Sequence, residues 1–179
     1  MMTLYLVTGG FGHLGYTVAT QLLEQEKNVL LFDVAEKPYL KNMERLKIAK
    51  GDIRNKDDLE KLFAMTKGKR TFVIHCAGLV SIKTKEDRLV DEVNVTGTAN
   101  IVEFCMKYNV EKLIYVGSVH AIREKPKGTT ITEPSTYYPS QVKGQYARTK
   151  AKATLTVMNS VKKGLKAVVV HPSGIIGPN

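Results

Sequence analysis

Three side chains in the second half of the sequence are suited to moving a proton at a substrate oxygen. Tyr146 and Lys150 are four residues apart in a predicted helix, so they share one face of it. A phenol, with an ordinary pKa near ~10, is a weak base at neutral pH unless a nearby cation favours the phenolate, and Lys150 supplies that cation. Ser118 follows a predicted strand, where its hydroxyl can hold the oxygen while Tyr146 transfers the proton. The three residues are therefore candidates for acid–base chemistry at a substrate oxygen, the alternative being that Tyr146 and Lys150 are an ordinary surface pair.

A glycine-rich stretch near the N-terminus is suited to binding a dinucleotide. Residues 8–15 read Thr-Gly-Gly-Phe-Gly-His-Leu-Gly, in which Gly9, Gly12 and Gly15 are evenly spaced and Gly10 starts an overlapping Gly-x-Gly-x-x-Gly. One glycine permits a tight turn, the next lets the backbone approach a pyrophosphate, and the last allows a helix to pack closely on a strand. The pyrophosphate would lie at the helix N-terminus, where free N–H groups and the helix dipole favour an anion. Because the stretch follows a predicted strand and opens a predicted helix, it indicates a dinucleotide site.

The identity of the dinucleotide depends on Asp33, which ends the second predicted strand 18 residues after Gly15. A carboxylate there accepts hydrogen bonds from a ribose 2′-hydroxyl but repels a 2′-phosphate. Lys37 is close enough in the sequence to weaken this preference. NAD is therefore the cofactor that we expect, with NADP as the less favoured alternative.

The elements that must position these residues alternate between short apolar runs and longer amphipathic ones. The apolar runs predict six buried strands, at 4–8, 28–33, 46–51, 71–76, 112–118 and 165–171. The amphipathic runs predict helices that begin near Leu14 and at 57–65, 90–108 and 145–163. This alternation predicts a parallel sheet covered by helices on both faces. Together with the glycine motif it indicates an α/β fold of the Rossmann type, a doubly wound parallel sheet of six strands in the order 3-2-1-4-5-6. Residues 122–143 form the longest irregular stretch, and a loop of that length is usually a lid or a binding loop.

The composition is that of one ordinary globular domain. The chain has 179 residues, of which 43% are hydrophobic and 25% are charged, which argues against disorder, collagen or a coiled coil. No apolar run approaches the roughly 20 residues needed to span a bilayer, and the N-terminus lacks the basic region of a signal peptide. The two cysteines cannot build a disulfide framework, so a reducing, cytoplasmic location is expected.

The net charge of +10 is concentrated in residues 104–179, which hold 12 Lys and Arg against 3 Asp and Glu. A basic half is compatible with nucleic acid, an acidic ligand or a missing acidic surface, but a solvated lysine-rich face is the simpler interpretation. No zinc-finger spacing or helix-turn-helix signature supports nucleic acid, and no His or Cys pair has metal-ligand spacing. The expected partners are a small-molecule substrate and, in a homodimer, a second copy of the chain, with no nucleic acid, no membrane and no metal.

Taken in order, the motifs of this chain resemble those of the short-chain dehydrogenase/reductases, specifically the extended branch that includes NAD-dependent epimerases and dehydratases. The resemblance covers nearly the whole chain. It comprises the glycine motif, Asp33, the adenine-site pair Asp52-Ile53, the strand-four motif at 73–79, the helical Asn-Val-x-Gly-Thr at 94–98, the set Ser118, Tyr146 and Lys150, and the Pro-x-x-Ile-x-Gly-Pro at 172–178.

The resemblance implies a role for each motif. Tyr146 would be the proton donor or acceptor, Lys150 would bind the nicotinamide ribose and favour the phenolate, and Ser118 would orient the reacting oxygen. Asn94, on the buried stripe of its helix, would support them as a fourth catalytic residue, hydrogen-bonded to backbone or to water. The cofactor-binding residues that the resemblance implies are Gly9, Gly12, His13, Leu14, Gly15, Asp33, Asp52, Ile53, Cys76, Ala77, Gly78, Tyr146, Lys150, Pro172, Ser173 and Ile175.

Departures from the family patterns narrow the reaction. The segment around Ser118 has neither carboxylate of the Thr-Asp-Glu that sugar dehydratases of the branch carry there, so dehydration is disfavoured. It also lacks the Val-Tyr-Gly usual in sugar epimerases, and it looks closer to dihydroflavonol reductases and 3β-hydroxysteroid dehydrogenases. We therefore expect an NAD-dependent oxidoreductase acting on a small carbonyl or alcohol. The alternatives are a nucleotide-sugar epimerase or a truncated NAD-binding module without turnover.

Members of this branch continue beyond the last motif into a region that closes over the substrate. In this chain the motif ends at residues 177–179. We therefore expect residues 1–179 to form an NAD(P)-binding Rossmann domain from which the C-terminal substrate-binding region is absent.

The four histidines receive different interpretations. His75 ends a buried strand and is expected to be a hydrogen-bonded core residue rather than a ligand, whereas His13 lies in the phosphate turn and is expected to face solvent. His171 replaces the arginine usual in the family, which is expected to weaken the local hydrogen bonding. His120, two residues after Ser118, is a candidate for contact with the substrate.

Overall fold

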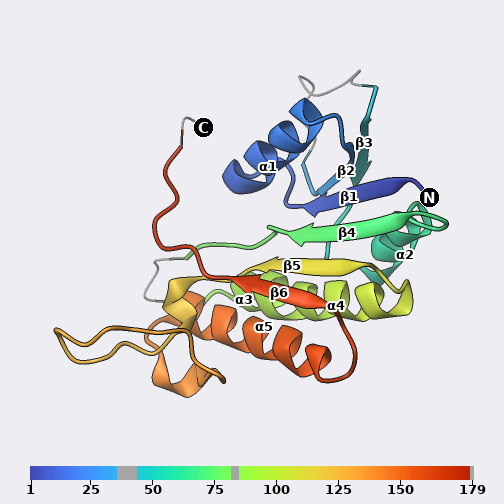
Figure 1. Cartoon of the computed structure of the whole chain (residues 1–179). Coiled ribbons are helices and arrows are strands. Elements are labelled where there is room, and N and C mark those ends of the chain that lie inside the picture. Colours follow the sequence, from blue (N-terminus) through green and yellow to red (C-terminus); the bar gives the residue numbers. More distant parts are fainter. Residues whose placement is uncertain (36–43, 82–84, 178–179) are drawn as a thin grey trace.

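Six parallel strands form one sheet, and their order determines which predicted residues meet. The computed structural model describes residues 1–35, 44–81 and 85–177. The strands are β1 (Thr3–Thr8), β2 (Asn28–Asp33), β3 (Leu46–Lys50), β4 (Arg70–His75), β5 (Lys112–Val116) and β6 (Ala167–Val170). They lie in the order β3-β2-β1-β4-β5-β6, which confirms the predicted Rossmann topology (Figure 1). The strand order reverses between β1 and β4, and sheets of this type bind ligands at that point, outside the carboxyl ends of the strands.

The helices cover the sheet from both sides. α1 (His13–Glu24) packs on one face, where Ala19 joins Val7, Val29 and Leu31 in a buried cluster. α2 (Lys56–Ala64), α4 (Thr98–Lys107) and α5 (Gln145–Val161) lie on the opposite face (Figure 1). Successive strand residues point to opposite faces, so β1, β2 and β4 supply apolar side chains to both layers. None of the helices in the described ranges combines the length and the apolar character needed to cross a membrane.

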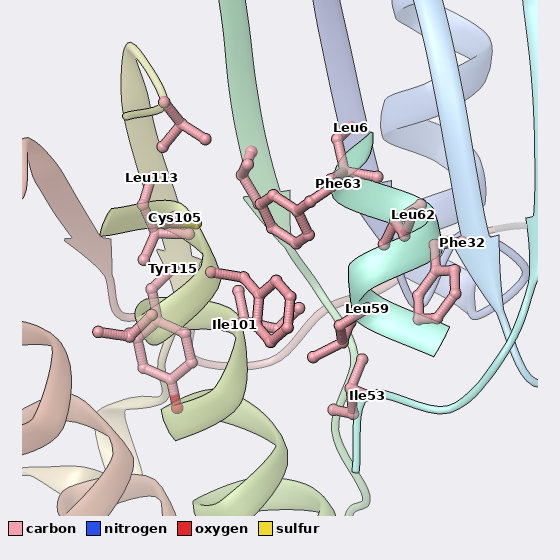
Figure 2. Close-up of a cluster of buried hydrophobic side chains, with 14 of the residues drawn as sticks. Leu6, Phe32, Ile53, Leu59, Leu62, Phe63, Ile101, Cys105, Leu113 and Tyr115 are labelled. Atoms are coloured by element: carbon pink, nitrogen blue, oxygen red, sulfur yellow. The ribbon is translucent and has the colours of Figure 1, made fainter. Parts of the chain in front are cut away.

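Large apolar side chains fill the layer between the sheet and α2, α4 and α5 (Figure 2). Phe63 of α2 tilts against Phe104 of α4, with 5.5 Å between the ring centroids. Ile101 of α4 and Tyr115 of β5 are fully buried in the same cluster. Truncating a buried aromatic residue to alanine typically costs about 3–5 kcal/mol. This cluster therefore holds α4 and its neighbours firmly on the sheet that carries the predicted site.

The long helix predicted in the middle of the chain is interrupted. α3 (Arg88–Asp91) continues into a π-helical segment (Glu92–Gly97) and then into α4. Gly97 packs so closely on Ile53 that a Cβ on it would lie 2.5 Å from the Cδ1 of that side chain. Hydrophobic periodicity reports which residues are buried but not the hydrogen-bonding step of the helix, so it could not reveal the π-helical turn. Such turns are frequent at functional sites, and this one carries Asn94.

The last two predicted strands are shorter than the sequence indicates. β5 ends at Val116 because Ser118 caps a short 3-10 helix (Val119–Ala121), its hydroxyl accepting a hydrogen bond from the N–H of His120. β6 begins only at Ala167, since the preceding residues close the end of α5. The apolar runs continue through these turns, which is why periodicity alone extends the strands.

Residues 122–143 lie mostly outside the layers of the domain and project away from the sheet (Figure 1). They contain one short 3-10 helix (Pro139–Gln141). Tyr137 is the buried anchor of the segment, packed with Ala121 and Ala151 against α5. The long irregular stretch is therefore attached to the same helix that carries Tyr146.

Candidate active site

The glycine motif forms the turn between β1 and α1 that the sequence predicts. Gly9 has a φ of +67°, and a Cβ on it would lie 2.6 Å from the backbone nitrogen of Ala77. A Cβ on Gly15 would lie 2.1 Å from the carbonyl oxygen of Gly9, so the helix can approach the turn only without a side chain there. A Cβ on Gly12 would meet that same oxygen at 3.3 Å and nothing else nearby. No side chain caps the first turn of α1, which begins directly after Gly12, and this leaves room for an anion at the helix N-terminus.

Asp33, at the end of β2, is held by two backbone N–H groups. Its Oδ2 accepts a hydrogen bond from Phe11 and its Oδ1 accepts one from Ala35, both at 3.0 Å. Each carboxylate oxygen has a second lone pair, so Asp33 can also accept hydrogen bonds from ribose hydroxyls. Lys37, the cation that could weaken the preference for NAD, lies outside the described residues.

A cleft of about 440 Å³ opens at the carboxyl ends of β1, β2 and β4. Small-molecule sites usually have roughly 300–1,000 Å³, so the cleft has a suitable size for part or all of a cofactor. Eight of the predicted cofactor residues line it: Gly9, Gly12, Asp33, Asp52, Ile53, Cys76, Ala77 and Gly78. The lining also includes residues that sequence reasoning missed, namely Phe11, Phe32, Val34, Ala35, Gly51, Arg54, Leu79, Leu89 and Val93. Many of these adjoin a strand end or a recognised motif, and that adjacency is the signal that could have found them.

Arg54 shapes the part of the cleft beside Asp52. Its guanidinium bonds to the Asp52 carboxylate, with 2.6 Å between Nη2 and Oδ2, and to Glu92, with 3.0 Å between Nη1 and Oε2. Hydrogen bonding from Arg54 holds the pKa of Asp52 below its usual range, so this carboxylate stays ionised near neutral pH. The side-chain amide of Asn100 donates to the carbonyl oxygens of Ile53 at 3.0 Å and of Arg54 at 3.3 Å. Asn100 therefore fixes the loop after β3 from the side of α4.

The remaining predicted cofactor residues lie outside this cleft. These are His13, Leu14 and Gly15 at the start of α1, Tyr146 and Lys150 in α5, and Pro172, Ser173 and Ile175 after β6. The prediction that His13 faces solvent is wrong, because its half-buried ring lies against Gly177 and its Nδ1 is buried without a hydrogen-bond partner among the described residues. The reason is that the segment after β6 returns toward α1 (Figure 1).

Lys150 projects from α5 into the interior beside the sheet. Only 6% of its surface is exposed, and its Nζ donates a hydrogen bond to the carbonyl oxygen of Val116 at 2.9 Å. The same nitrogen lies 5.2 Å from the centre of the Tyr115 ring, whose π-face attracts a cation. Burial lowers the pKa of Lys150 to about 8, an effect that nearby Cys76 partly opposes. The ammonium is thus placed at the end of β5, next to the residues that lead to Ser118.

Asn94 links the π-helical segment to the loop after β4 and to α5. Its Oδ1 accepts a hydrogen bond from the N–H of Leu79 at 2.8 Å, and its Nδ2 donates to the Leu79 carbonyl at 2.9 Å. The same Nδ2 also donates to the hydroxyl of Thr149 at 3.1 Å. Burial of this amide, with hydrogen bonds to backbone, agrees with what its position in the sequence led us to expect.

Ser118 and Tyr146 come to the same end of the sheet from different elements. Ser118 is buried after β5, and the short 3-10 helix that it caps packs against the start of α5. Tyr146 is half-buried in the first turn of α5, and its ring meets that of His120 edge-on, with 6.2 Å between the centroids. His120 therefore lies beside the residue expected to move the proton, on the side that leads to the surface.

His75 and Cys76 are better explained as core and cleft residues than as ligands. The two ring nitrogens of His75 lie 2.6 Å from the Thr8 hydroxyl and 3.1 Å from the Thr98 hydroxyl. Complete burial lowers the pKa of His75 to about 3, so the ring is neutral. Burial likewise raises the pKa of the Cys76 thiol to about 12. Among the residues in the described ranges, no three His, Cys, Asp or Glu side chains gather into a group that could hold a metal ion.

His171, which replaces the arginine usual in the family, makes hydrogen bonds through both ring nitrogens. Its Nδ1 lies 3.0 Å from the carbonyl oxygen of Ser118, and its Nε2 lies 2.6 Å from the hydroxyl of Tyr137. The imidazole is short enough to fit against Gly117 and still reach both partners.

The strand order, the glycine turn and the cleft at the strand ends define a dinucleotide-binding domain of the Rossmann type. Within this class, the model of the 3-beta hydroxysteroid dehydrogenase/isomerase family matches residues 6–179. The chain belongs to that family, which is part of the extended short-chain dehydrogenase/reductases.

Relatives in other organisms include dehydrogenases and epimerases. Short-chain dehydrogenase/reductase family 42E member 1 of Homo sapiens is 30% identical over 181 residues, which cover 97% of this chain and 46% of that protein. Sterol-4-alpha-carboxylate 3-dehydrogenase, decarboxylating, of Saccharomyces cerevisiae is 30% identical over 185 residues, which cover 97% of this chain and 51% of that protein. The crystal structure of the UDP-glucose 4-epimerase of Thermus thermophilus in complex with NAD matches with a TM-score of 0.78 and 30% identity, covering 94% of this chain and 54% of that one. The chain thus spans about half the length of the curated relatives it matches.

Proposed function

We propose that residues 1–179 form the NAD-binding domain of an oxidoreductase that transfers a hydride between nicotinamide and a carbonyl or alcohol, with a substrate-binding region formed by residues outside this range. The position of Gly78 carries the proposal. Gly78 lines the dinucleotide cleft, and a Cβ on it would lie 3.3 Å from both the Nζ of Lys150 and the Oδ1 of Asn94. The cleft and the candidate catalytic residues therefore adjoin, as hydride transfer with coupled proton transfer requires.

In this proposal NAD supplies the hydride chemistry, and the side chains of the chain handle the proton. Tyr146 donates a proton to the reacting oxygen or accepts one from it, and Ser118 donates a hydrogen bond to the same oxygen. Lys150 contributes a positive charge one helical turn from Tyr146, in a buried place where water screens it little. Asn94 holds the loop after β4 and Thr149 in fixed relation, so the cofactor and α5 keep one geometry.

The cofactor preference follows from Asp33. Its carboxylate is fixed by the N–H groups of Phe11 and Ala35, so it cannot swing away from an incoming 2′-phosphate without losing both bonds. We expect NADH to bind at least about tenfold more tightly than NADPH, because an unpaired like charge in such a site costs more than about 1.4 kcal/mol. Fluorescence titration of the reduced cofactors measures both Kd values. A tighter Kd for NADPH would contradict the assignment of NAD.

A nucleotide-sugar epimerase is the second candidate, and the likeness to the NAD complex of a UDP-glucose 4-epimerase favours it. The same proton and hydride chemistry serves both reactions, since an epimerase oxidises its substrate and then reduces it again. The two differ in the fate of the cofactor. An oxidoreductase releases NADH with product, whereas an epimerase retains NAD and shows no net change in it.

The test uses the enzyme that contains residues 1–179 together with the proposed substrate-binding region, mixes it with NAD⁺ and either a 3β-hydroxysteroid or UDP-glucose, and follows NADH absorbance and the epimeric sugar. We expect NADH to form with the steroid and to be lost in Tyr146→Phe, while Tyr138→Phe, which alters an exposed tyrosine nearby, keeps the activity. Epimerised sugar without NADH would select the epimerase. Tight binding of NADH by this enzyme, with no turnover of either probe, would contradict both enzymatic functions and leave an NAD-binding module.

A further inference from the structure

The imidazole of His171 lies between the segment of Ser118 and the long irregular stretch. Its Nδ1 is 3.0 Å from the carbonyl oxygen of Ser118, and its Nε2 is 2.6 Å from the phenolic oxygen of Tyr137. Tyr137 is 7% exposed, although most of the residues before it, from 123 to 136, are exposed. One side chain at the end of β6 therefore contacts both the proposed catalytic serine and the anchor of residues 122–143.

The partners of His171 determine where its protons are. A carbonyl oxygen can only accept, so Nδ1 must carry the hydrogen that is donated to Ser118. In the neutral ring Nε2 then has a lone pair, and it accepts the hydrogen of the Tyr137 hydroxyl. Nδ1 thus donates a hydrogen bond to the Ser118 backbone, and Nε2 accepts one from Tyr137.

The packing around the ring shows that this position is specific. A Cβ on Gly117 would lie 2.9 Å from Nδ1 and 3.0 Å from Cε1 of His171, so the ring rests directly on the backbone of Gly117. On its other side the ring meets that of Tyr137, with 5.3 Å between centroids and a tilt of 35°. The imidazole has little freedom to leave these contacts.

The carbonyl oxygen of Ser118, in the turn after β5, accepts two hydrogen bonds. It accepts a hydrogen bond from the N–H of Ala121 at 3.0 Å in addition to the one from His171. The next N–H, that of Val119, donates to the carbonyl of Pro172 at 3.1 Å. The direction of the Ser118 hydroxyl follows from the direction of this backbone, because Ser118 Oγ itself accepts from the N–H of His120.

We propose that His171 is a positioning residue: its Nδ1–H fixes the backbone that aims the hydroxyl of Ser118, while its Nε2 holds the 122–143 stretch through Tyr137. The catalytic part of this inference rests on the proposed function, but the positioning of Ser118 does not. His171 itself touches neither substrate nor cofactor in this scheme.

The experiment distinguishes the roles of the two ring nitrogens of His171 by means of two variants of similar polarity. Asparagine places an amide nitrogen close to where Nδ1 lies, and glutamine places its amide close to where Nε2 lies, so His171→Asn retains the bond to Ser118 and His171→Gln retains the one to Tyr137. Hydrogen–deuterium exchange of the amides of residues 119–121 reports on the turn that Ser118 caps. We expect exchange about tenfold faster in His171→Gln than in the original chain, and exchange near the original rate in His171→Asn.

Two further variants control for a general loosening of the fold. Tyr137→Phe should speed exchange within residues 130–136 but not within 119–121, and Tyr138→Phe should change neither. His171→Asn exchanging at residues 119–121 as fast as His171→Gln would overturn the proposal, since the bond to the Ser118 carbonyl would then not hold the turn.

The kinetic arm uses the enzyme that includes the proposed substrate-binding region, with NAD⁺ and a 3β-hydroxysteroid as the probe. We expect His171→Gln to lower kcat about tenfold with little change in the Kd of NADH, and His171→Asn to restore most of kcat. Equal kcat in the two variants, with exchange that differs, would overturn the catalytic part. Absence of turnover in the original chain would contradict the proposed function alone, because the exchange pattern still decides whether His171 positions Ser118.

Discussion

The side-chain amide of Gln145 pairs with both backbone polar groups of Asp87. Its Nε2 donates to the Asp87 carbonyl at 2.8 Å, and its Oε1 accepts from the Asp87 N–H at 2.9 Å. The Nε2 also donates to the carboxylate of Asp91 at 2.5 Å. Gln145 is the first residue of α5 and directly precedes Tyr146, so these bonds tie the helix that carries the proposed proton donor to the start of α3.

We expect Gln145→Ala to misplace Tyr146 while leaving the cofactor cleft intact. Each of the three lost hydrogen bonds of this buried amide contributes about 0.5–1.5 kcal/mol, so the free energy of unfolding should fall by about 1.5–4.5 kcal/mol. Turnover of a 3β-hydroxysteroid with NAD⁺ should fall about tenfold in kcat, because a displaced general acid loses much of its effect. The Kd of NADH should stay within about twofold of the original value, since no cleft residue is changed.

The matched control for this prediction is Gln21→Ala, which removes an exposed amide on α1. It should alter neither kcat nor the free energy of unfolding by a measurable amount. A Gln145→Ala variant with full kcat and lowered stability would show that the Asp87 pairing serves only the fold.

Two glycines of the phosphate turn should respond differently to the same substitution. Gly12→Ala adds a Cβ that meets only the Gly9 carbonyl oxygen, at 3.3 Å, at a residue whose φ is −73°, so we expect stability to change by less than about 1 kcal/mol. Gly15→Ala forces a Cβ against the Gly9 carbonyl at 2.1 Å and should cost about 1–3 kcal/mol or more. The methyl group on Gly12 would stand where a pyrophosphate approaches the helix, so the Kd of NADH should rise at least about tenfold. Urea unfolding and NADH fluorescence measure the two effects, and unchanged NADH binding by a folded Gly12→Ala variant would place the pyrophosphate elsewhere.

His75 should make the stability of the domain fall in acid. Its pKa is about 3 in the folded chain and near 6.5 when unfolded, so between these values the unfolded state binds a proton that the folded state does not. The stability that the neutral ring contributes is therefore complete above pH ~6.5 and is lost toward pH ~3, by up to about 1.4 kcal/mol per pH unit. Unfolding by urea across this range should show that the free energy of unfolding of His75→Gln falls less steeply with decreasing pH than that of the original chain. Parallel curves for His75→Gln and the original chain would contradict the buried neutral assignment.

Much of this site could be predicted because the Rossmann topology leaves little freedom. Once the strand order is given, Gly9, Asp33 and Gly78 must meet at one edge, since each follows a parallel strand whose neighbours are known. Asn94 could likewise be assigned to the interior, because it lies on the apolar stripe of its helix. Gly9, Asp33 and Asn94 were found through periodicity and spacing, which are properties of short stretches, and Gly78 through the resemblance of residues 73–79 to a family motif.

The residues that escaped prediction act through partners far away in the sequence. Asn100 holds the carbonyl of Ile53, and Gln145 holds the backbone of Asp87. A polar side chain that binds a distant carbonyl has no periodic signature, because its partner is a backbone group that every residue possesses. The hydrogen bonds of His171 escaped for the same reason, and only the structure supplies them.

Lys150 should lower the stability of the folded chain at neutral pH, as residues retained for function often do. Its ammonium is buried against the Val116 carbonyl and the Tyr115 ring, and in the part of the chain that the structure describes it forms no ion pair. Burial lowers its pKa from 10.5 to about 8, which means that folding disfavours its charged form. An apolar side chain of similar length removes that penalty, so we expect Lys150→Met to be more stable than the original chain by about 1–3 kcal/mol at pH 7.

The pH dependence of the stability that Lys150→Met gains over the original chain identifies the cause of that gain. Between pH ~8 and pH ~10.5 the unfolded state binds a proton on Lys150 that the folded state has released, so the original chain becomes more stable as the pH rises through this window. The stability advantage of Lys150→Met should therefore shrink between pH 7 and pH ~10. Turnover should be lost in Lys150→Met at every pH, because the charge beside Tyr146 is gone. A Lys150→Met variant that is equally destabilised at both pH values would show that the bond to Val116 outweighs the burial of the ammonium.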